Sequence, residues 1–260
     1  MEKQKELNDL YRHPYFAEMQ KKLEKKMNSI SIPFLPSILR TDKSYKNYTE
    51  DLYNSGAIRV MIVGQEVNGL GFVSEDAKTW DDKKSFEDVV NFSKDFYSEH
   101  SITNDSQIAL SCDSSFFKLG WNHFVKKIQS DIPDKKFVFV WNNLNNIGPA
   151  GKGSFHNDKE TDEYKALRSF KKSISLKELS ILQPDIVIFL TGQRDDEICD
   201  FYNVDENQFE ILDKRFDKNE LAWIKNFPIA KVVYRTKHPT NGLSNDVKDA
   251  IIADIEENFK

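Results

Sequence analysis

The chain has little cysteine and no long hydrophobic run. Its two cysteines, Cys112 and Cys199, cannot by themselves ligate a structural zinc ion or an iron–sulfur cluster. No apolar run approaches the roughly 20 residues that a membrane helix needs, and the N-terminal residues MEKQKELNDL contain no signal-peptide core. We therefore expect a cytoplasmic protein that uses no membrane, metal or cofactor, and both cysteines should be buried as small hydrophobic residues in a reducing compartment.

The chain also has no excess of positive charge, with 37 Lys and Arg residues against 42 Asp and Glu residues. The formal net charge of −5 argues against a polyanion as partner, because Lys and Arg supply much of the affinity for nucleic acids. Local basic stretches at 21–26, 165–177 and 214–237 can still override the total, although such stretches are usually solvated helix faces. With 39% hydrophobic and 12% aromatic residues, the composition is that of a folded globular protein.

Four short segments are rich in β-branched and aromatic residues and are apolar on both alternations. They occupy residues 58–64, 137–141, 185–192 and 231–236. This pattern is typical of strands that helices cover on both faces of a parallel sheet. We therefore predict an α/β protein, a three-layer α/β/α sandwich whose central, mostly parallel sheet has four strands.

Helical patterns lie between and beyond these segments. They cover residues 85–97, 114–128, 161–182 and 245–259, and a polar loop is expected at 142–158. The N-terminal residues 1–28 also have a helical pattern, which is interrupted near Pro14. A chain of this length fits one domain, 1–260, in which residues 1–40 form an N-terminal helical extension.

Polar residues follow each predicted strand directly. Ligands of open α/β sheets bind outside the carboxyl ends of the strands. We therefore expect Gln65 and Glu66, Asn142, Gly192 and His238 to converge on one crevice. Glutamate, asparagine and histidine there indicate acid–base and hydrogen-bonding chemistry.

The order of these motifs resembles the uracil-DNA glycosylase superfamily. The chain has VGQE at 63–66, WNN at 141–143, a strand ending in TG at 191–192, and HPTNGLS at 238–244. The family typically has GQDPYH, a strand that ends in a base-reading asparagine, and HPSPLS. The resemblance implies that Glu66 is the catalytic acid, Asn142 the base-reading amide and His238 the electrophilic histidine.

Further contacts follow from the same resemblance. Leu243 corresponds to the leucine that wedges into the duplex, with one residue inserted before it, and the flanking Thr240 and Ser244 would contact DNA. Phe72 or Trp80 would stack on a flipped base, beside Gln65 and Asn68. Two alternatives stay open. Asn143, Asn145 and Asn146 stand beside Asn142, and Leu243 has the pattern of an ordinary hydrophobic residue at the start of a helix.

The chain departs from the family motif after its acid. Val67-Asn68-Gly69 stands where the family has Pro-Tyr-His, and in uracil-specific members that tyrosine walls off carbon 5 of the pyrimidine. A smaller residue there opens space for a substituent, so a 5-substituted pyrimidine such as hydroxymethylated or glucosylated cytosine is as credible as uracil. The superfamily includes bacterial antiviral enzymes that attack such bases, so either antiviral defence or DNA repair is compatible with the sequence.

The expected function is that of a monofunctional DNA glycosylase. Base release leaves positive charge on the sugar and negative charge on the base, and a carboxylate at Glu66 and a donor at His238 can stabilise both. The partner is DNA, and no obligatory protein partner is inferred. The alternative is a non-catalytic α/β module that has kept the crevice and binds a nucleotide or DNA.

Overall fold

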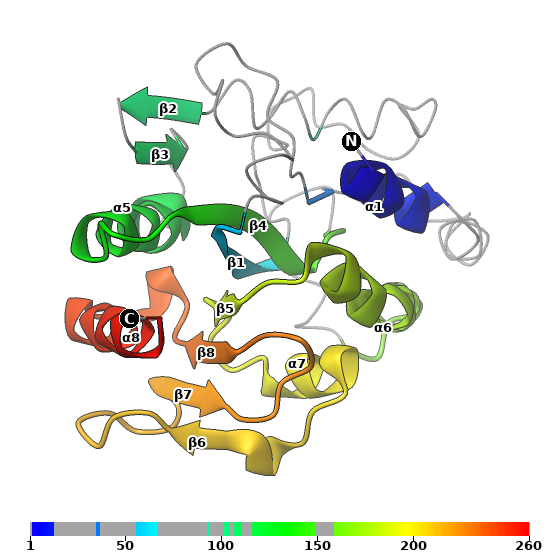
Figure 1. The fold of residues 1–260 in the computed structure, drawn as a ribbon. Coiled ribbons are helices and arrows are strands. Elements are labelled where there is room, and N and C mark those ends of the chain that lie inside the picture. The colour runs from blue at the N-terminus through cyan, green and yellow to red at the C-terminus, as the bar shows by residue number, and fades with distance from the viewer. Residues whose placement is uncertain are drawn as a thin grey trace, which may run out of the picture.

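The centre of the molecule is a six-stranded sheet with the strand order β4-β1-β5-β8-β7-β6 (Figure 1). The computed structural model describes residues 2–12, 35–36, 56–66, 93, 101–104, 107–110, 116–148 and 159–259. Within them, a separate two-stranded sheet pairs β2 (Ser101–Asn104) with β3 (Gln107–Leu110) in antiparallel fashion. The chain is therefore a mixed α/β protein.

Four neighbouring strands of the large sheet run parallel, and they are the four that the sequence predicts. They are β1 (Ile58–Glu66), β4 (Phe137–Asn145), β5 (Ile186–Phe189) and β8 (Val232–Thr236). The chain passes from β1 to β4 on one side and then back across β1 to β5 on the other. Such a reversal of strand order is where open α/β sheets bind ligands, at the carboxyl ends of the strands.

The predicted number of strands was wrong, because the sheet has six and not four. Beyond β8, the strands β7 (Leu221–Ile224) and β6 (Phe209–Ile211) extend it in antiparallel fashion. These strands have four and three residues, which is too short for an alternating pattern to stand out. In β6 only Phe209 is buried.

The predicted loop at 142–158 was also wrong in its first residues, because β4 continues to Asn145. Asn142 pairs with Val63, Asn143 with Gly64 and Asn145 with Glu66, so the strand keeps its register with β1 through a run of polar residues. All nine residues of β4 are buried. A polar run can stay in a buried strand only where its side chains find hydrogen-bond partners inside the protein.

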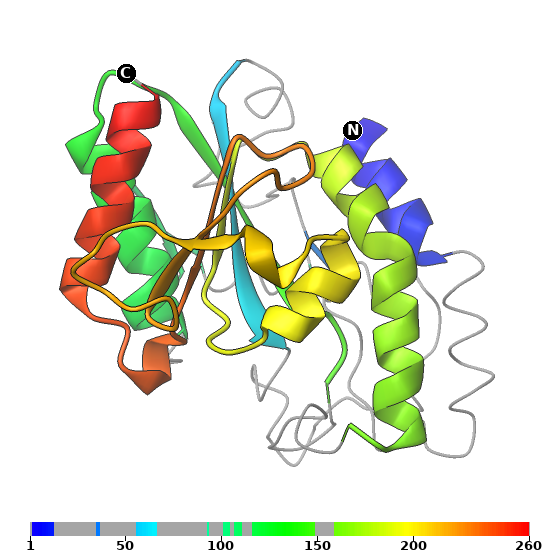
Figure 2. The same cartoon turned by 90° about the horizontal axis from the view of Figure 1, so that it is seen from below.

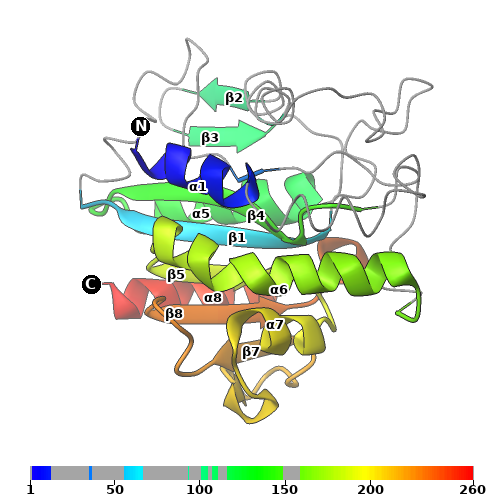
Figure 3. The ribbon, with the colours of Figure 1, turned by 90° about the vertical axis from the view of Figure 1, so that its right-hand side faces the viewer.

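Helices cover both faces of the sheet. The helices α5 (Asn122–Asp131) and α8 (Asn245–Asn258) lie on one face, whereas α1 (Glu2–Arg12), α6 (Asp162–Leu182) and α7 (Asp195–Tyr202) lie on the other (Figures 2 and 3). The structure confirms the helices expected at 161–182 and 245–259 to within one residue at each end. The short α7 was not expected, and the helix expected at 85–97 lies outside the described residues apart from Ser93.

Side-chain caps explain why the two long helices begin where the sequence indicates. The hydroxyl of Thr161 accepts a hydrogen bond from the backbone of Tyr164 at the start of α6. Ser244 does the same for Val247 at the start of α8. Each cap satisfies a backbone N–H group that has no partner within its helix, and such a cap contributes about 1 kcal/mol.

The helix expected from residue 114 begins differently. Residues Phe116–Trp121 form a π-helical segment that leads directly into α5. Wider turns of this kind are rare and are frequently found at functional sites. Within this segment the backbone at Gly120 lies close to Pro239, because a Cβ atom at position 120 would come within 2.9 Å of the proline ring.

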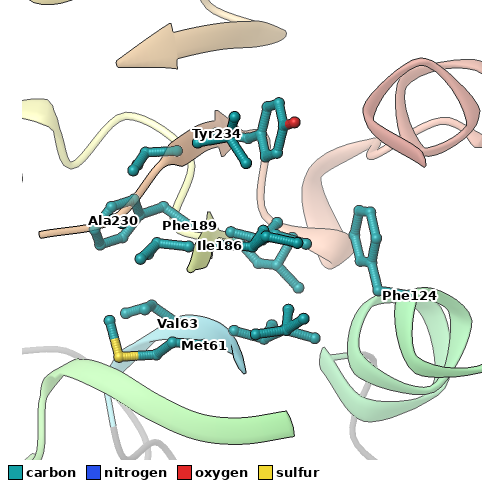
Figure 4. Close-up of a cluster of buried hydrophobic side chains, with 14 of the residues drawn as sticks. Met61, Val63, Phe124, Ile186, Phe189, Ala230 and Tyr234 are labelled. Carbon is teal, nitrogen blue, oxygen red and sulfur yellow. The ribbon is translucent and has the colours of Figure 1, made fainter. Parts of the chain in front are cut away.

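The apolar core fills the space between the sheet and the helices. Figure 4 shows side chains from three parallel strands in one cluster, including Met61, Val63 and Phe189. The ring of Phe189 lies 5.5 Å from that of Tyr202 in α7, measured between centroids. Each such side chain contributes about 1.5–3 kcal/mol when it is fully buried, which explains why these strands are apolar on both alternations.

The N-terminal helix α1 packs against α6. The rings of Tyr11 and Phe170 meet edge to face with centroids 6.0 Å apart. Most of the rest of the predicted extension, including Pro14, lies outside the described residues. No helix in the part of the chain that the structure describes is both long and apolar enough to cross a membrane.

Candidate functional site

The carboxyl ends of β1, β5 and β8 meet around Gly192. Gln65 donates a hydrogen bond from Nε2 to the backbone oxygen of Thr191, with a length of 2.7 Å. The N–H group of Gly192 in turn donates to the backbone oxygen of Thr236 at 2.9 Å. The polar residues that follow three predicted strands are therefore brought together, as the sequence predicts for this edge of the sheet.

Gly192 has a backbone conformation that favours glycine. Its φ is +60°, in the left-handed region. A Cβ atom at this position would lie 3.5 Å from the backbone nitrogen of His238 and 3.7 Å from Nε2 of Gln65. The glycine thus lies where Gln65 at the end of β1 and His238, the second residue after β8, both approach the end of β5.

His238 has one ring nitrogen bound within its own turn. It precedes the short 3₁₀ turn Pro239–Asn241, and its Nδ1 accepts a hydrogen bond from the backbone of Thr240. The hydroxyl of Thr240 lies 2.6 Å from the same nitrogen. An imidazole whose Nδ1 is an acceptor carries its proton on Nε2, so that nitrogen is the available donor.

The environment of His238 favours the neutral ring. Burial, together with the positive charge of Arg194, lowers the pKa of His238 from 6.5 to about 4. The ring is therefore uncharged at neutral pH and can donate one hydrogen bond without carrying a charge of its own.

The other predicted catalytic residue, Glu66, is the last residue of β1. Its backbone pairs with that of Asn145 in β4. Glu66 therefore lies at the same edge of the sheet as His238. Three predicted base-binding residues, Asn68, Phe72 and Trp80, lie outside the described residues.

The side-chain amide of Asn142 is not free, because all of its hydrogen-bonding positions are used inside the protein. Its Nδ2 donates to Glu178 at 3.1 Å and contacts the sulfur of Met61 at 3.8 Å. Its Oδ1 accepts from the backbone of Asn143 at 2.8 Å and from the amide of Asn146 at 3.0 Å. An amide has two donors and two acceptor positions, and all four are used here. The structure therefore does not support the base-reading role predicted for Asn142.

Glu178 of α6 belongs to a buried charged cluster between this helix and the sheet. It forms an ion pair of 2.7 Å with Lys171, and both side chains are almost completely buried. Tyr11 of α1 also donates to Glu178, and Lys171 donates to Asn146. Asn142 and Asn146 are thus parts of the packing between the sheet and α6.

Asn145 has a comparable partner in α7. Its Nδ2 donates to Oε2 of Glu197 at 3.2 Å. The other oxygen of Glu197 accepts from Tyr164 at 3.1 Å and from Arg194 at 3.2 Å. Three of the four asparagines in this run therefore hold buried charged groups.

Asn143 is the exception in this run. Its Oδ1 accepts from the indole of Trp141 at 3.2 Å, but its Nδ2 is buried without a partner among the described residues. Side chains alternate along a strand, so Asn143 lies on the face opposite Asn142. Its neighbour in β1 is Gly64, which has no side chain to cover it. A buried donor without a partner is costly, so this amide is a candidate for ligand recognition.

A second polar atom lacks a partner at the same edge. The hydroxyl of Thr191 is buried and makes no hydrogen bond to the described residues. Neither Asn143 nor Thr191 could be singled out from one sequence. The four asparagines have the same chemistry, and only the helices that pack on β4 distinguish among them.

The predicted DNA contacts fall in different surroundings. Leu243 is buried in the hydrophobic core, which is the packing of an ordinary residue at the start of a helix and does not support a role as a wedge. Ser244 caps α8. Thr240 and Ser244 are exposed, and Thr240 contacts His238.

The described lysines of the basic stretches are largely paired within the protein. The closest partners are Glu160 for Lys165, Glu178 for Lys171, Asp200 for Lys172, Glu210 for Lys225 and Glu220 for Lys237. These stretches therefore do not form an unpaired basic face, and residues 21–26 lie outside the described part.

The described residues hold no group of three or more His, Cys, Asp or Glu side chains that could bind a metal ion. Cys199 is partly buried, and burial raises the pKa of its thiol to about 11, so it is not a reactive thiolate at neutral pH. Cys112 lies outside the described residues.

Comparison with known proteins gives no relative. No protein-family model matches the chain, and no curated protein matches it.

Proposed function

We propose that this protein is a monofunctional DNA glycosylase that hydrolyses the N-glycosidic bond of a flipped, 5-substituted pyrimidine or of uracil. The observation that carries the proposal is the meeting of Gln65, Gly192 and His238 at the ends of three parallel strands. Helices on both faces of the sheet agree with the three-layer sandwich that the resemblance to uracil-DNA glycosylases implies. Repair and antiviral defence are both compatible with this activity.

The chemistry assigns different tasks to Glu66 and His238. As the bond to the base breaks, the carboxylate of Glu66 stabilises the positive sugar and orients the attacking water. The Nε2–H group of neutral His238 donates to the carbonyl oxygen of the base, where negative charge develops. Both groups act on charges that exist only in the transition state, so they accelerate the reaction more than they increase affinity.

We assign the base-reading amide to Asn143 in place of Asn142. The Nδ2 of Asn143, which has no partner in the described part of the chain, can donate to an acceptor on the base, whereas every position of the Asn142 amide is already bound. An extruded base is read by hydrogen bonds to its edge, which require a donor or acceptor that other protein groups do not already occupy. Asn143 meets this requirement.

A panel of DNA substrates tests the proposal. Duplexes and single strands that carry uracil, hydroxymethyluracil, hydroxymethylcytosine or glucosylated hydroxymethylcytosine are incubated with the protein. Free base and abasic sites are then measured. We expect release of at least one of these bases and no strand nicking by the protein itself. No release from any of the four substrates would reject the proposed activity.

The pairing of the lysines favours a second candidate, a non-catalytic module that binds a nucleotide in the same crevice. A nucleotide has few phosphates and does not need an extended basic face, whereas duplex affinity depends on many Lys and Arg contacts. Calorimetry with nucleotides and with duplex DNA distinguishes the two. Binding of the nucleotide alone, without base release, favours this module.

A further inference from the structure

One buried carboxylate in α7, that of Glu197, contacts residues from three parts of the fold. Oε2 accepts from Asn145, the last residue of β4. Oε1 accepts from Tyr164 in α6 and from Arg194, which precedes α7. The side chain of Glu197 is fully buried. A single charged group thus joins the end of β4 to α6 and α7 on this face.

The contact with Asn145 leads to the candidate acid. Asn145 and Glu66 are register partners at the ends of β4 and β1. A side chain that holds Asn145 in place therefore also holds the backbone at Glu66. The end of a strand opens easily unless contacts of this kind restrain it.

The contact with Arg194 leads to the histidine. The backbone N–H of Arg194 donates to the oxygen of Gly192 at 2.9 Å, and a Cβ atom at Gly192 would contact both Gln65 and His238. Arg194 is itself buried, and its charge acts on the ring of His238. The guanidinium group of Arg194 forms an ion pair with Glu197 that has a length of 3.2 Å and helps to hold it in place.

We propose that Glu197 is a positioning residue for the glycosylase reaction, which holds Glu66 and His238 in one geometry through Asn145 and Arg194. This inference rests on the proposed function. Glu197 touches neither the reacting base nor the sugar. It acts by restraining the two strand ends and by balancing the positive charge beside the histidine.

The physical reason lies in the burial of both charges. A buried arginine is stable only when it is paired and hydrogen-bonded. Without the carboxylate, Arg194 would lose its ion pair with Glu197, and its guanidinium group would shift or its charge would act more strongly on His238. Either change would disturb the ring that donates to the departing base. A small displacement of a catalytic group lowers the rate much more than it lowers affinity.

The test combines kinetics with titration of the histidine. Glu197→Gln keeps the shape of the side chain and removes its charge. We expect kcat to fall on the order of 10- to 100-fold with little change in KM. In NMR spectra of the histidine ring, Arg194→Gln should raise the midpoint of His238 from about 4 toward its ordinary value of 6.5, since a positive charge is removed. Glu197→Gln should lower it, and the double variant should lie between.

Glu178→Gln is the matched control. Glu178 is as buried as Glu197 and is also ion-paired, but its hydrogen bond is to Asn142 of β4 and not to Asn145. We expect this variant to lose stability without moving the midpoint of His238. The inference is overturned if the Glu197 and Arg194 variants leave both that midpoint and kcat unchanged.

Two further outcomes are also decisive. If the wild-type protein releases no base, the proposed function fails, and the ring titration alone then decides whether Glu197 and Arg194 control His238. If Glu197→Gln does not fold, Arg194→Gln tests the same link from its other end, and an unchanged midpoint in that variant rejects the inference.

Discussion

Gln65 donates a hydrogen bond of 2.7 Å from its side-chain amide to the backbone oxygen of Thr191, and this bond joins the end of β1 to the end of β5. The two strands are neighbours at the point where the strand order reverses. The bond therefore holds the ends of β1 and β5 together at this edge of the sheet. One N–H of the Gln65 amide is therefore used inside the protein.

Removal of the two proposed catalytic groups should abolish most base release. We expect Glu66→Gln to retain the fold and DNA affinity and to lose most of the single-turnover rate. His238→Ala should cost about 3 kcal/mol of transition-state stabilisation, since one preorganised donor is lost. Single-turnover base release with saturating protein measures both. Wild-type rates in both variants would show that this sheet edge is not the reaction centre.

Alanine at Asn142 and at Asn143 should have opposite consequences. Asn142→Ala removes the hydrogen bonds with Glu178, with the backbone of Asn143 and with Asn146, and the buried carboxylate of Glu178 loses a donor. We therefore expect a loss of about 2–3 kcal/mol in the free energy of unfolding. Asn143→Ala removes one hydrogen bond, from the Trp141 indole, and an amide nitrogen without a partner among the described residues, so we expect the smaller loss, about 1 kcal/mol, while base discrimination falls.

Urea unfolding and base release, measured on the same two variants, check this contrast. Each variant serves as the control for the other because the chemical change is identical at adjacent positions. A large loss of stability in Asn143→Ala with unchanged selectivity would assign Asn143 to packing.

The stability of the protein should depend on pH through His238. Its pKa is about 4 in the folded protein and 6.5 as the ordinary value, so the unfolded chain binds the proton more tightly. Stability contributed by the neutral ring is therefore fully present above pH 6.5 and is lost as pH falls from 6.5 toward 4. Unfolding measured between those pH values should show a smaller decline in His238→Ala than in the wild type. Equal declines would contradict the buried, neutral ring.

The paired lysines should contribute little to DNA binding. Lys172 and Lys225 are bound to Asp200 and Glu210, each at 2.5 Å. We expect Lys172→Gln and Lys225→Gln to leave the dependence of duplex affinity on salt unchanged. Fluorescence anisotropy at several salt concentrations measures the log–log slope. A decrease of about 0.9 in the slope of either variant would mean that its ammonium group contacts a phosphate.

Asn68 should determine which substituent the pocket admits at carbon 5 of the base. The prediction depends on the sequence, because Asn68 lies outside the described residues. Asn68→Tyr should fill the space and restore a preference for uracil by steric exclusion. The ratio of single-turnover rates on uracil and hydroxymethylated substrates, before and after the change, is the measurement. An unchanged ratio would place Val67-Asn68-Gly69 away from the base.

The sequence alone determined the parallel part of the sheet and the long helices. A strand that is buried on both faces must be apolar on both alternations, so β1 and β8 stand out without any knowledge of their neighbours. The capping residues Thr161 and Ser244 act within three residues of their partners, and local chemistry of this kind can be read directly from the chain. Glu66 and His238 were placed at one edge because parallel strands end together.

Only the tertiary structure decided the roles of the four asparagines. Asn142, Asn145 and Asn146 are each held by a charged group from a helix that lies between 25 and 52 residues away in the chain. No local pattern records such a contact. The same holds for β6 and β7, whose few residues become strands because β8 offers a free edge to β7. Periodicity depends on neighbours along the chain, whereas the pairing of a buried polar group depends on which elements pack together in space.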